Sequence, residues 1–291
     1  MPLSTLVLIA ATIVVSSFLS GVFGMAGGMI LLGVLLVYYD VSTAVVLFSI
    51  IQFAANGWRA VLWYRFVRWP VFFPYVAGAM VAFVGLRLIE YVPDKATVYL
   101  LLGAMPFLVE LLPRRAHPSI EWPGMPFFAG ALTTVVQFMS GVGGVFLDLF
   151  FQKSLLDRKT TVATKAVTQT FSHVLRAVYF GSIGGLADVA NWTTLAAVAL
   201  AIAATSTTPY VIERMSDHGF RQWTRVVIYV ISTVYLVRGG SLRSRPPEPE
   251  WTSYQRWVSS PGASPAMTAQ HVGQCHQEAH QVTRRVRSRA S

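Results

Sequence analysis

The sequence predicts an all-α, polytopic membrane protein made of two homologous, inverted repeats, each with a glycine-broken helical hairpin and three further transmembrane helices. Three observations predict this class. Of the 291 residues, 54% are hydrophobic and only 12% are charged. Apolar stretches of about 20 residues, long enough to cross the hydrocarbon core of a bilayer, recur along the chain. Glycine clusters interrupt two of these stretches, and polar residues recur at a fixed spacing between the halves.

The first half begins with the apolar run 6–39. A run of this length is too long for one straight helix at about 1.5 Å per residue, and the glycines near its middle favour a hairpin of two helices. Three single helices are expected to follow, at 41–64, 69–89 and 96–112. Arg65 and Arg68 mark the loop between the first two of them.

The second half begins after residues 113–123, which combine prolines with basic residues. The run 126–151 repeats the glycine-broken pattern, and single helices are expected at 160–180, 192–212 and 223–237. From Arg238 onward, Pro, Ser, Arg and Gln dominate, which is typical of disorder. The predicted divisions are a first transmembrane repeat (1–113), a second transmembrane repeat (114–238) and a basic, disordered tail (239–291).

Composition also excludes several classes. A soluble protein would need helices with polar faces, which are scarce here. The single cysteine, Cys275, excludes an internal disulfide framework and a cysteine-based zinc site. The net charge of +10 comes from loops and the tail, so membrane topology explains it without a nucleic-acid partner. Residues 1–20 lack a basic leader region, and we expect them to belong to the mature protein.

The two glycine clusters read Ser-Gly-Val-Phe-Gly-Met-Ala-Gly-Gly at 20–28 and Ser-Gly-Val-Gly-Gly at 140–144. A broken helix leaves backbone N–H groups without partners, and the helix dipole adds positive potential there, so each cluster predicts an anion site. The alternative is that glycine allows close helix packing. Two clusters at matched places favour the anion site, and the expected substrate-binding glycines are Gly24, Gly27, Gly28, Gly141, Gly143 and Gly144.

An internal repeat connects the halves. Gly27-Gly28 matches Gly143-Gly144 at an offset of 116, and the polar residues downstream match at 117. These polar residues are Gln52, Asn56 and Arg59 in the first half, and Gln169, His173 and Arg176 in the second. Matched polar residues are better evidence of duplication than apolar ones, which match by chance, and duplication is common among secondary transporters.

The charges of the loops favour inverted repeats, in which equivalent helices of the two halves cross the membrane in opposite directions. If each glycine-broken segment is a hairpin, nine basic residues of the internal loops lie on one side, which the positive-inside rule makes cytoplasmic. They are Arg65, Arg68, Arg114, Arg115, Lys153, Arg158, Lys159, Arg214 and Arg221. Among the internal loops, only Lys95 lies opposite. Arg238, Arg243 and Arg245 conflict with this assignment, so the orientation of the termini is left open.

Segment 160–180 carries a polar face. Along it, polar residues recur at spacings of three and four and so share one side of a helix: Lys165, Gln169, Ser172, His173 and Arg176. Charged groups at membrane depth are expensive and normally face the bundle interior, where they could attract an anion. The alternative is that Lys165 and Arg176 snorkel to opposite interfaces. They are only ~16 Å apart along a helix, so at least one is expected to be internal.

The matched face in the first half carries Gln52, Asn56 and Arg59, and we expect it to contribute to substrate binding. Snorkelling remains the alternative for Arg59, which lies near a helix end. Asp148 and His173 are candidates for proton or sodium coupling, although Asp148 could equally form a structural ion pair.

Other polar groups carry weaker signals. Glu110 lies near a helix end and is expected at the interface. The tail residues His271, Cys275, His276 and His280 have a spacing that could bind a metal on a helix, but their apolar-poor surroundings argue against it. We find no nucleotide-binding loop, no metalloprotease helix and no Ser/His/Asp pattern. We therefore expect no catalytic residue, no metal and no cofactor.

At these residues the chain resembles the TauE/SafE family, also called the TSUP or sulfite exporter family. The resemblance covers about residues 5–238. It rests on SGVFGMAGGMILLG from Ser20, SGVGGVFLDLFF from Ser140 and, most specifically, TTVATKAVTQTFSHVLRAVYFG from Thr160. The family implies multi-pass carriers of the inner or plasma membrane, built from two repeats, that move sulfite, organosulfonates such as sulfoacetate and related anions, usually outward.

Together these observations predict a secondary transporter, in the exporting direction, for a small sulfur-containing anion. The expected partners are that anion, the lipid bilayer and a coupling proton or sodium ion. An anion channel is the first alternative, and a membrane enzyme or assembly subunit is the second. The enzyme would need an acid and base pair, for which the core offers only Asp148 and His173. Substrate identity, coupling ion and oligomeric state are left open.

Overall fold

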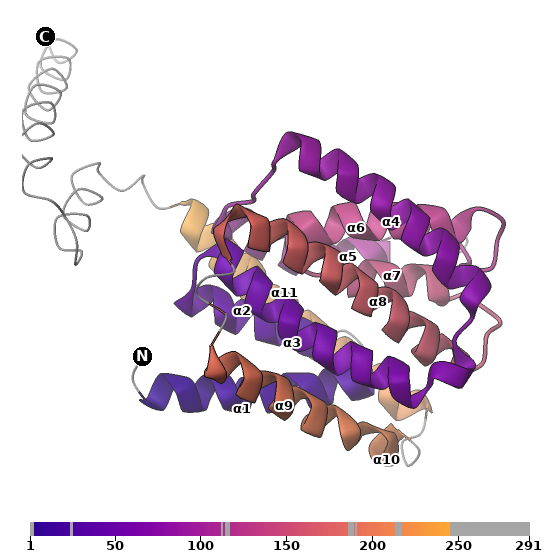
Figure 1. Ribbon diagram of the computed structural model, residues 1–291, viewed down its shortest axis with the longest axis horizontal. Helices are drawn as coiled ribbons and strands as arrows, with labels where there is room; N and C mark the ends of the chain where they lie inside the picture. The colour runs from indigo at the N-terminus through magenta and orange to yellow at the C-terminus, as the bar shows by residue number, and fades with distance from the viewer. Residues whose placement is uncertain are drawn as a thin grey trace, which may run out of the picture. The chain divides into compact units, whose positions relative to one another are not determined.

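The computed structural model describes residues 3–23, 26–111, 113, 117–185, 189, 191–212 and 217–244, and all regular structure within these ranges is helical. In the first half the elements are α1 (Leu3–Phe23), α2 (Ala26–Tyr38), α3 (Val41–Leu62), the 3₁₀ turn η1 (Tyr64–Phe66), α4 (Trp69–Ile89) and α5 (Lys95–Leu111). The predicted hairpin is therefore two helices, α1 and α2, which pack against each other (Figure 1).

In the second half the elements are α6 (Met125–Ser140), α7 (Gly144–Phe151), α8 (Arg158–Phe180), the π turn η3 (Gly181–Gly185), α9 (Trp192–Ser206), α10 (Thr208–Ile212) and α11 (Asp217–Arg243). Asp40 and Asp157, which are 117 residues apart, both cap a helix. The side chain of Asp40 accepts from Thr43 N at 3.0 Å, and that of Asp157 accepts from Thr160 N at 2.9 Å. Both α3 and α8 therefore begin at equivalent positions.

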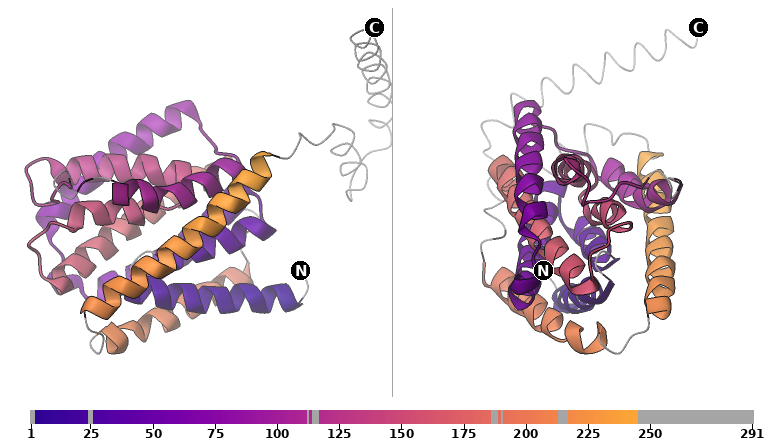
Figure 2. Two further views of the ribbon diagram at one scale, coloured as in Figure 1. Left: turned by 180° about the vertical axis from the view of Figure 1, so that it is seen from behind. Right: turned by 90° about the vertical axis from the view of Figure 1, so that its right-hand side faces the viewer.

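Helices at matching places in the two halves make matching contacts. α3 packs on α8, and α5 packs on α11. In addition, α4 packs against α6 and contacts α8. In the same way, its counterpart α9 packs against α1 and contacts α3, which are the counterparts of α6 and α8. Figure 1 shows α3 and α8 side by side, and Figure 2 shows α11 running as a long diagonal across the opposite face. The two halves thus meet along α3 and α8.

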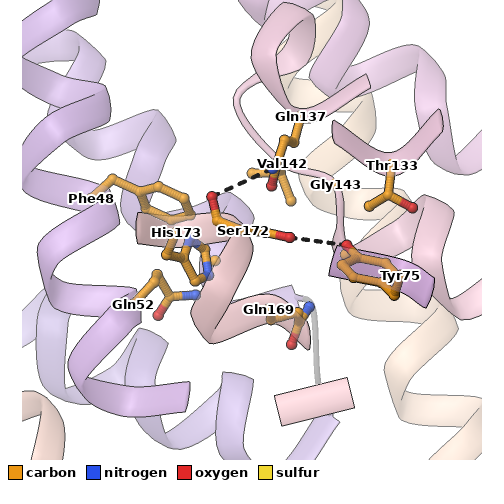
Figure 3. A pocket seen from close by; sticks show the side chains of 12 residues that line it. Phe48, Gln52, Tyr75, Thr133, Gln137, Val142, Gly143, Gln169, Ser172 and His173 are labelled. Atoms are coloured by element: carbon orange, nitrogen blue, oxygen red, sulfur yellow. Dashed lines mark hydrogen bonds between the residues drawn. The ribbon is translucent and has the colours of Figure 1, made fainter. Parts of the chain in front are cut away.

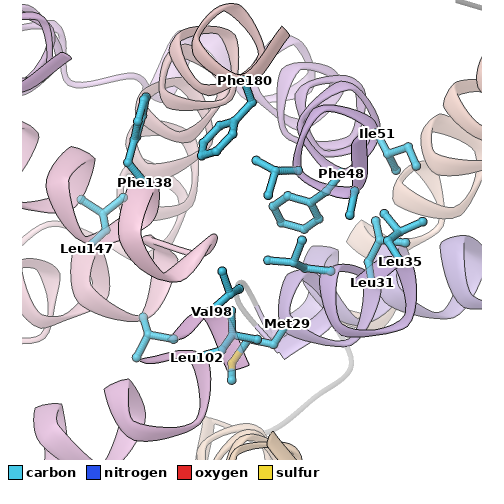
Figure 4. Close-up of a cluster of buried hydrophobic side chains, with 14 of the residues drawn as sticks. Met29, Leu31, Leu35, Phe48, Ile51, Val98, Leu102, Phe138, Leu147 and Phe180 are labelled. Carbon is cyan, nitrogen blue, oxygen red and sulfur yellow. The ribbon is translucent and has the colours of Figure 1, made fainter. Parts of the chain in front are cut away.

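The apolar core lies between these helices (Figure 4). The short second helix of each hairpin, α2 or α7, contributes strongly to this core: Leu31 and Leu35 of α2 and Leu147 of α7 are fully buried. By contrast, large apolar side chains project outward from the longer helices: Val7 and Val15 of α1, Phe73, Val81, Val84 and Leu88 of α4, and Leu195 of α9. An apolar exterior of this extent is typical of helices that face lipid.

Three of the described helical segments are long and apolar enough to span a membrane: Leu3–Gly21, Val41–Leu62 and Trp69–Ile89. Gly27–Tyr38 and Met125–Ser140 are apolar but shorter. The short limbs are expected for a hairpin that enters and leaves on one side. α8, which carries the polar face, does not reach the same level of hydrophobicity, because polar residues occupy its inward side.

Four predicted element boundaries were wrong, one of them the start of the last helix, which begins at Asp217 and not at residue 223. Residues 181–185 continue α8 as a π turn, not as a loop. The helix expected at 192–212 ends at Ser206 and restarts at Thr208, because Pro209 has no N–H group to continue the ladder. The last helix runs to Arg243 instead of residue 237, and Gly239 explains this, since it allows α11 to lie against Leu100 of α5.

Candidate functional site

The second glycine cluster breaks the helix through two glycines with different roles. Gly141 has φ +79°, a left-handed conformation that glycine adopts without strain, and it ends α6. Gly143 caps the start of α7 and lies so close to α6 that an added Cβ would be 2.8 Å from Gln137 Cβ and 2.9 Å from Thr133 Cγ2. The chain therefore turns sharply and presents the first N–H groups of α7 at the break.

The first glycine cluster separates α1 from α2. At Gly27 an added Cβ would overlap the backbone of Ser16 and Ser20, so this glycine serves close packing of the hairpin limbs. At Gly28 it would be 3.0 Å from Gln52 Nε2, and Gly28 faces the polar side of α3. Gly24 lies outside the residues that the structure describes.

A pocket with about 390 Å³ of empty volume, including its opening to solvent, lies where the two breaks and the two polar helices meet (Figure 3). It brings together six of the predicted residues, from both halves: Gly28, Gln52, Gly143, Gly144, Gln169 and His173. The two glycine breaks and the polar faces of α3 and α8 therefore contribute to one pocket. Asn56, Arg59, Gly27, Gly141, Lys165 and Arg176 do not line this pocket.

Six further residues line the pocket and were not predicted as site residues: Phe48, Tyr75, Thr133, Gln137, Val142 and Ser172. Tyr75 Oη lies 2.9 Å from Ser172 Oγ, and Gln137 Nε2 donates to Ser172 O at 3.5 Å. Ser172 lies on the polar face of α8 and was visible in the sequence. Gln137 and Thr133 are one and two turns before the second glycine break, and this spacing was the signal for them.

Arg176 lies directly behind this pocket and is fully buried. Its Nε donates to Ser49 Oγ of α3 at 2.8 Å, its Nη1 donates to Gly141 O, and its Nη2 lies 2.7 Å from His173 Nδ1. Its guanidinium carbon also lies 4.5 Å from the ring centroid of Phe48. Arg176 therefore connects the break, α3 and α8 without reaching an interface, which excludes snorkelling in this structure.

His173 is held between the Arg176 guanidinium and the Asn56 side-chain amide. Arg176 Nη2 can only donate, so His173 Nδ1 accepts and the proton of the neutral ring belongs on Nε2. Nε2 lies 3.2 Å from Nδ2 of Asn56, which also donates to Gln52 O at 3.0 Å. Rotating the Asn56 amide would offer its Oδ1, which has no partner in the described part of the chain. A second proton on His173 would point at the guanidinium, so this geometry disfavours the charged ring.

Lys165 forms an ion pair with Asp148, and the two side chains are 17% and 21% exposed. Asp148 lies one turn beyond Gly144 on α7, and Lys165 lies one turn before Gln169 on α8. The pair thus closes the space between these helices one turn away from the pocket. It contributes no net charge, since the carboxylate and the ammonium compensate each other.

Arg59 is the counterpart of Arg176 in the first half, and it is only 5% exposed. Its Nε and Nη2 have no hydrogen-bond partner within the described ranges. Neither Arg59 nor Arg176 is paired with an Asp or Glu among the residues that the structure describes. Two buried guanidinium groups therefore make the region around α3 and α8 positive. Glu110, in contrast, is exposed on the last turn of α5.

The pocket combines neutral hydrogen-bonding groups with this nearby positive charge. Amides, hydroxyls and the N–H groups at the start of α7 can hold an oxyanion, and a helix N-terminus adds favourable potential. In the described part of the chain, no group of three His, Cys, Asp or Glu side chains could hold a metal ion. The tail residues His271, Cys275, His276 and His280 lie outside the described ranges.

Comparison with known proteins agrees with this chemistry. The family model named Sulfite exporter TauE/SafE matches residues 8–236, which covers both glycine breaks and every residue of the pocket. Searches of curated proteins and of solved structures gave no match. Because one family model matches most of the chain, the protein belongs to the TauE/SafE family of sulfite exporters, a family of membrane transporters.

Proposed function

We propose that this protein is a secondary carrier that exports a small sulfur-containing oxyanion, sulfite or an organosulfonate, across the inner or plasma membrane. The observation that carries the proposal is Arg176: a fully buried guanidinium beside the pocket, with no acidic partner in the described part of the chain. A buried cation without a counter-ion is costly, and an anion in the pocket lowers that cost. The family assignment supports sulfite as the first substrate to test.

The pocket supports an anion with several oxygen atoms. Gln52, Gln137 and Gln169 offer amide N–H groups from three helices, and the hydroxyls of Thr133 and Ser172 add further donors. These groups are neutral, so they can hold an oxyanion through hydrogen bonds while the charge is balanced by Arg176. A site of this kind can release its ligand, because no direct ion pair must be broken.

Alternating access follows from the two halves, which we infer are inverted repeats. The support is the exchange of contacts between halves and the opposite directions of α3 and α8. Along α3, Ser49 contacts Arg176 while Asn56 contacts His173, so one helix ascends as the other descends. Equivalent helices that run in opposite directions are what inversion requires. Rocking of one half against the other would then expose the pocket to each side in turn.

The geometry favours Asp148 over His173 as the coupling group. Protonation of Asp148 would release Lys165 from its ion pair, one turn from the pocket, and make its charge available to the anion. The Nδ1 atom of His173 accepts from Arg176, so a second proton on the ring would point at the guanidinium. Proton binding at Asp148 is therefore linked to anion binding in the pocket, which predicts that flux depends on an imposed pH gradient.

Transport by the purified full chain in proteoliposomes tests the proposal. We expect uptake of radiolabelled sulfite that saturates, is competed by sulfoacetate and shows counterflow when unlabelled sulfite is preloaded. Counterflow distinguishes a carrier from a channel, because only a carrier exchanges bound substrate. Flux that rises linearly with sulfite concentration and shows no counterflow would reject the carrier. Absence of any sulfite or sulfonate flux would reject the substrate class.

A further inference from the structure

Arg59 differs from Arg176 in how its guanidinium is satisfied. Both are buried in α3 and α8 at equivalent positions of the repeat. Arg176 uses all three of its nitrogen atoms in contacts with Ser49, Gly141 and His173. Arg59 leaves Nε and Nη2 without a partner in the part of the chain that the structure describes. A buried unpaired N–H on a cation is costly, so this difference calls for a ligand.

The repeat explains why Arg59 lacks these partners. Ser49, which accepts from Arg176, corresponds to Ala166 in the other half, and alanine has no hydroxyl group. Phe48, whose ring lies under the guanidinium of Arg176, corresponds to Lys165, which is paired with Asp148. At the equivalent positions, the second half therefore offers Arg59 neither a hydroxyl acceptor nor an aromatic ring.

Other buried polar groups, on the helices that pack against α3, also lack partners in the described part of the chain. Ser17 Oγ of α1 and Thr205 Oγ1 of α9 are fully buried and have no hydrogen-bond partner within the described residues. Ser17 corresponds to Thr133, which lines the pocket, at the offset of 116. Both halves thus carry a hydroxyl group at this position of the repeat, and the one in the second half, on Thr133, lines the pocket.

Two contacts join the helix segments that carry these groups at one level of the bundle. Trp58, next to Arg59, donates to Ser206 Oγ at 2.8 Å, and Ser206 is next to Thr205. Gly21 of α1 lies against Thr208, with an added Cβ only 2.2 Å from Thr208 Cγ2. Ser17 is one turn before Gly21, and Thr205 is one turn before Thr208, so each pair shares a helical face. α1, α3 and α9 pack against one another around this level.

We propose that Arg59, with the hydroxyls of Ser17 and Thr205, forms a second anion-binding position in the first half of the protein. The ligand class is the same small oxyanion that the pocket takes, so this proposal rests on the proposed function. The oxyanion satisfies the free Nε and Nη2 groups of Arg59 and accepts from the two hydroxyls. The two positions lie on opposite halves, and the anion would pass from one to the other as access alternates.

Equilibrium binding of radiolabelled sulfite and sulfate to the purified full chain in detergent tests this position. We expect two anions per chain in the wild-type protein and one in Arg59→Gln. Ser17→Ala and Thr205→Val should weaken the second binding event severalfold and leave the first unchanged. Arg59→Lys keeps the charge and should retain two binding events, the second with lower affinity. Arg65→Gln removes an exposed cation and is the matched control, with two anions retained.

The outcomes separate this proposal from the proposed function. One bound anion in both wild type and Arg59→Gln overturns the second position, even if Arg59→Gln lowers thermal stability, and leaves the transport proposal standing. Two bound anions in wild type and one in Arg59→Gln, without sulfite flux in proteoliposomes, would support the second position and reject transport. No bound anion in folded wild-type protein would overturn both. If Arg59→Gln does not fold, the affinity change in Arg59→Lys decides.

Discussion

Asn56 and His173 occupy the same place in the two halves of the sequence, 117 residues apart, and they touch: Asn56 Nδ2 lies 3.2 Å from His173 Nε2. A residue can contact its own repeat counterpart only near the axis that relates the two halves. This pair therefore lies where α3 crosses α8, beside the pocket and in contact with Arg176 through His173. The pair therefore joins α3 to α8, and its His173 also lines the pocket.

The first prediction concerns this pair. Asn56→Ala and His173→Ala should each slow sulfite flux, because each leaves a buried partner unsatisfied at about 1–3 kcal/mol. If the two side chains act through their contact, the double variant should lose less than the sum of the single losses. Initial rates in proteoliposomes and thermal stability in detergent measure both effects. Losses that add without coupling would show that the contact has no role of its own.

The second prediction concerns the break at Gly143. Gly143→Ala places a methyl group against Thr133 and Gln137, both of which line the pocket, so we expect flux to fall and stability to drop by roughly 1–3 kcal/mol. Gly85→Ala is the matched control, since no atom lies within 4 Å of its added Cβ. The control should keep full flux, and a helical Gly to Ala change should be neutral or stabilising by up to about 1 kcal/mol. Equal flux in Gly143→Ala and wild type would contradict a site at this break.

Much of this arrangement could be predicted from the sequence. Of the glycines and matched polar residues that the sequence singled out, Gly28, Gly143, Gly144, Gln52, Gln169 and His173 line one pocket. At least one of Lys165 and Arg176 was expected inside the bundle, and Arg176 is fully buried. These predictions succeeded because glycine in an apolar run and charge at membrane depth are both costly, so each signals a specific structural use.

The rest depended on tertiary contacts that periodicity does not encode. Tyr75 enters the pocket only because α4 packs beside α6, and no local pattern marks it. Among the glycines, Gly27 packs the hairpin while Gly28 faces the site, although they are adjacent in sequence. The pairing of Lys165 with Asp148 was one of two open alternatives, and the structure shows the ion pair.

The third prediction concerns that ion pair. Asp148→Asn should remove the dependence of sulfite flux on an imposed pH gradient, because the protonated state would be imitated permanently. His173→Gln should retain that dependence, since a second proton on His173 would point at the Arg176 guanidinium. Flux measured with and without a gradient, at equal membrane potential, distinguishes the two variants. A pH-gradient response that persists in Asp148→Asn and disappears in His173→Gln would reverse the assignment.

The contribution of the Asp148–Lys165 ion pair to folding stability can be measured separately. In a double-mutant cycle with Asp148→Asn and Lys165→Met, we expect a coupling energy within roughly 0.5–3 kcal/mol, the range for residues in contact. Each single change should cost less than the ~3–5 kcal/mol known for fully buried pairs, because these side chains are partly exposed. A coupling energy of zero would show that the two groups do not interact in the folded protein.

Arg176 carries the central claim, and sulfite flux in its variants tests that claim most directly. Arg176→Gln removes the charge beside the pocket, and Arg176→Lys keeps the charge but loses the planar contacts to Ser49, Gly141 and His173. In proteoliposomes, with protein that melts cooperatively and Arg65→Gln as control, we predict at least a tenfold loss of sulfite flux for Arg176→Gln, the loss expected for about 1.5–3 kcal/mol of charged hydrogen bonding. Arg176→Lys should retain more flux than Arg176→Gln. Wild-type flux in folded Arg176→Gln would contradict the account.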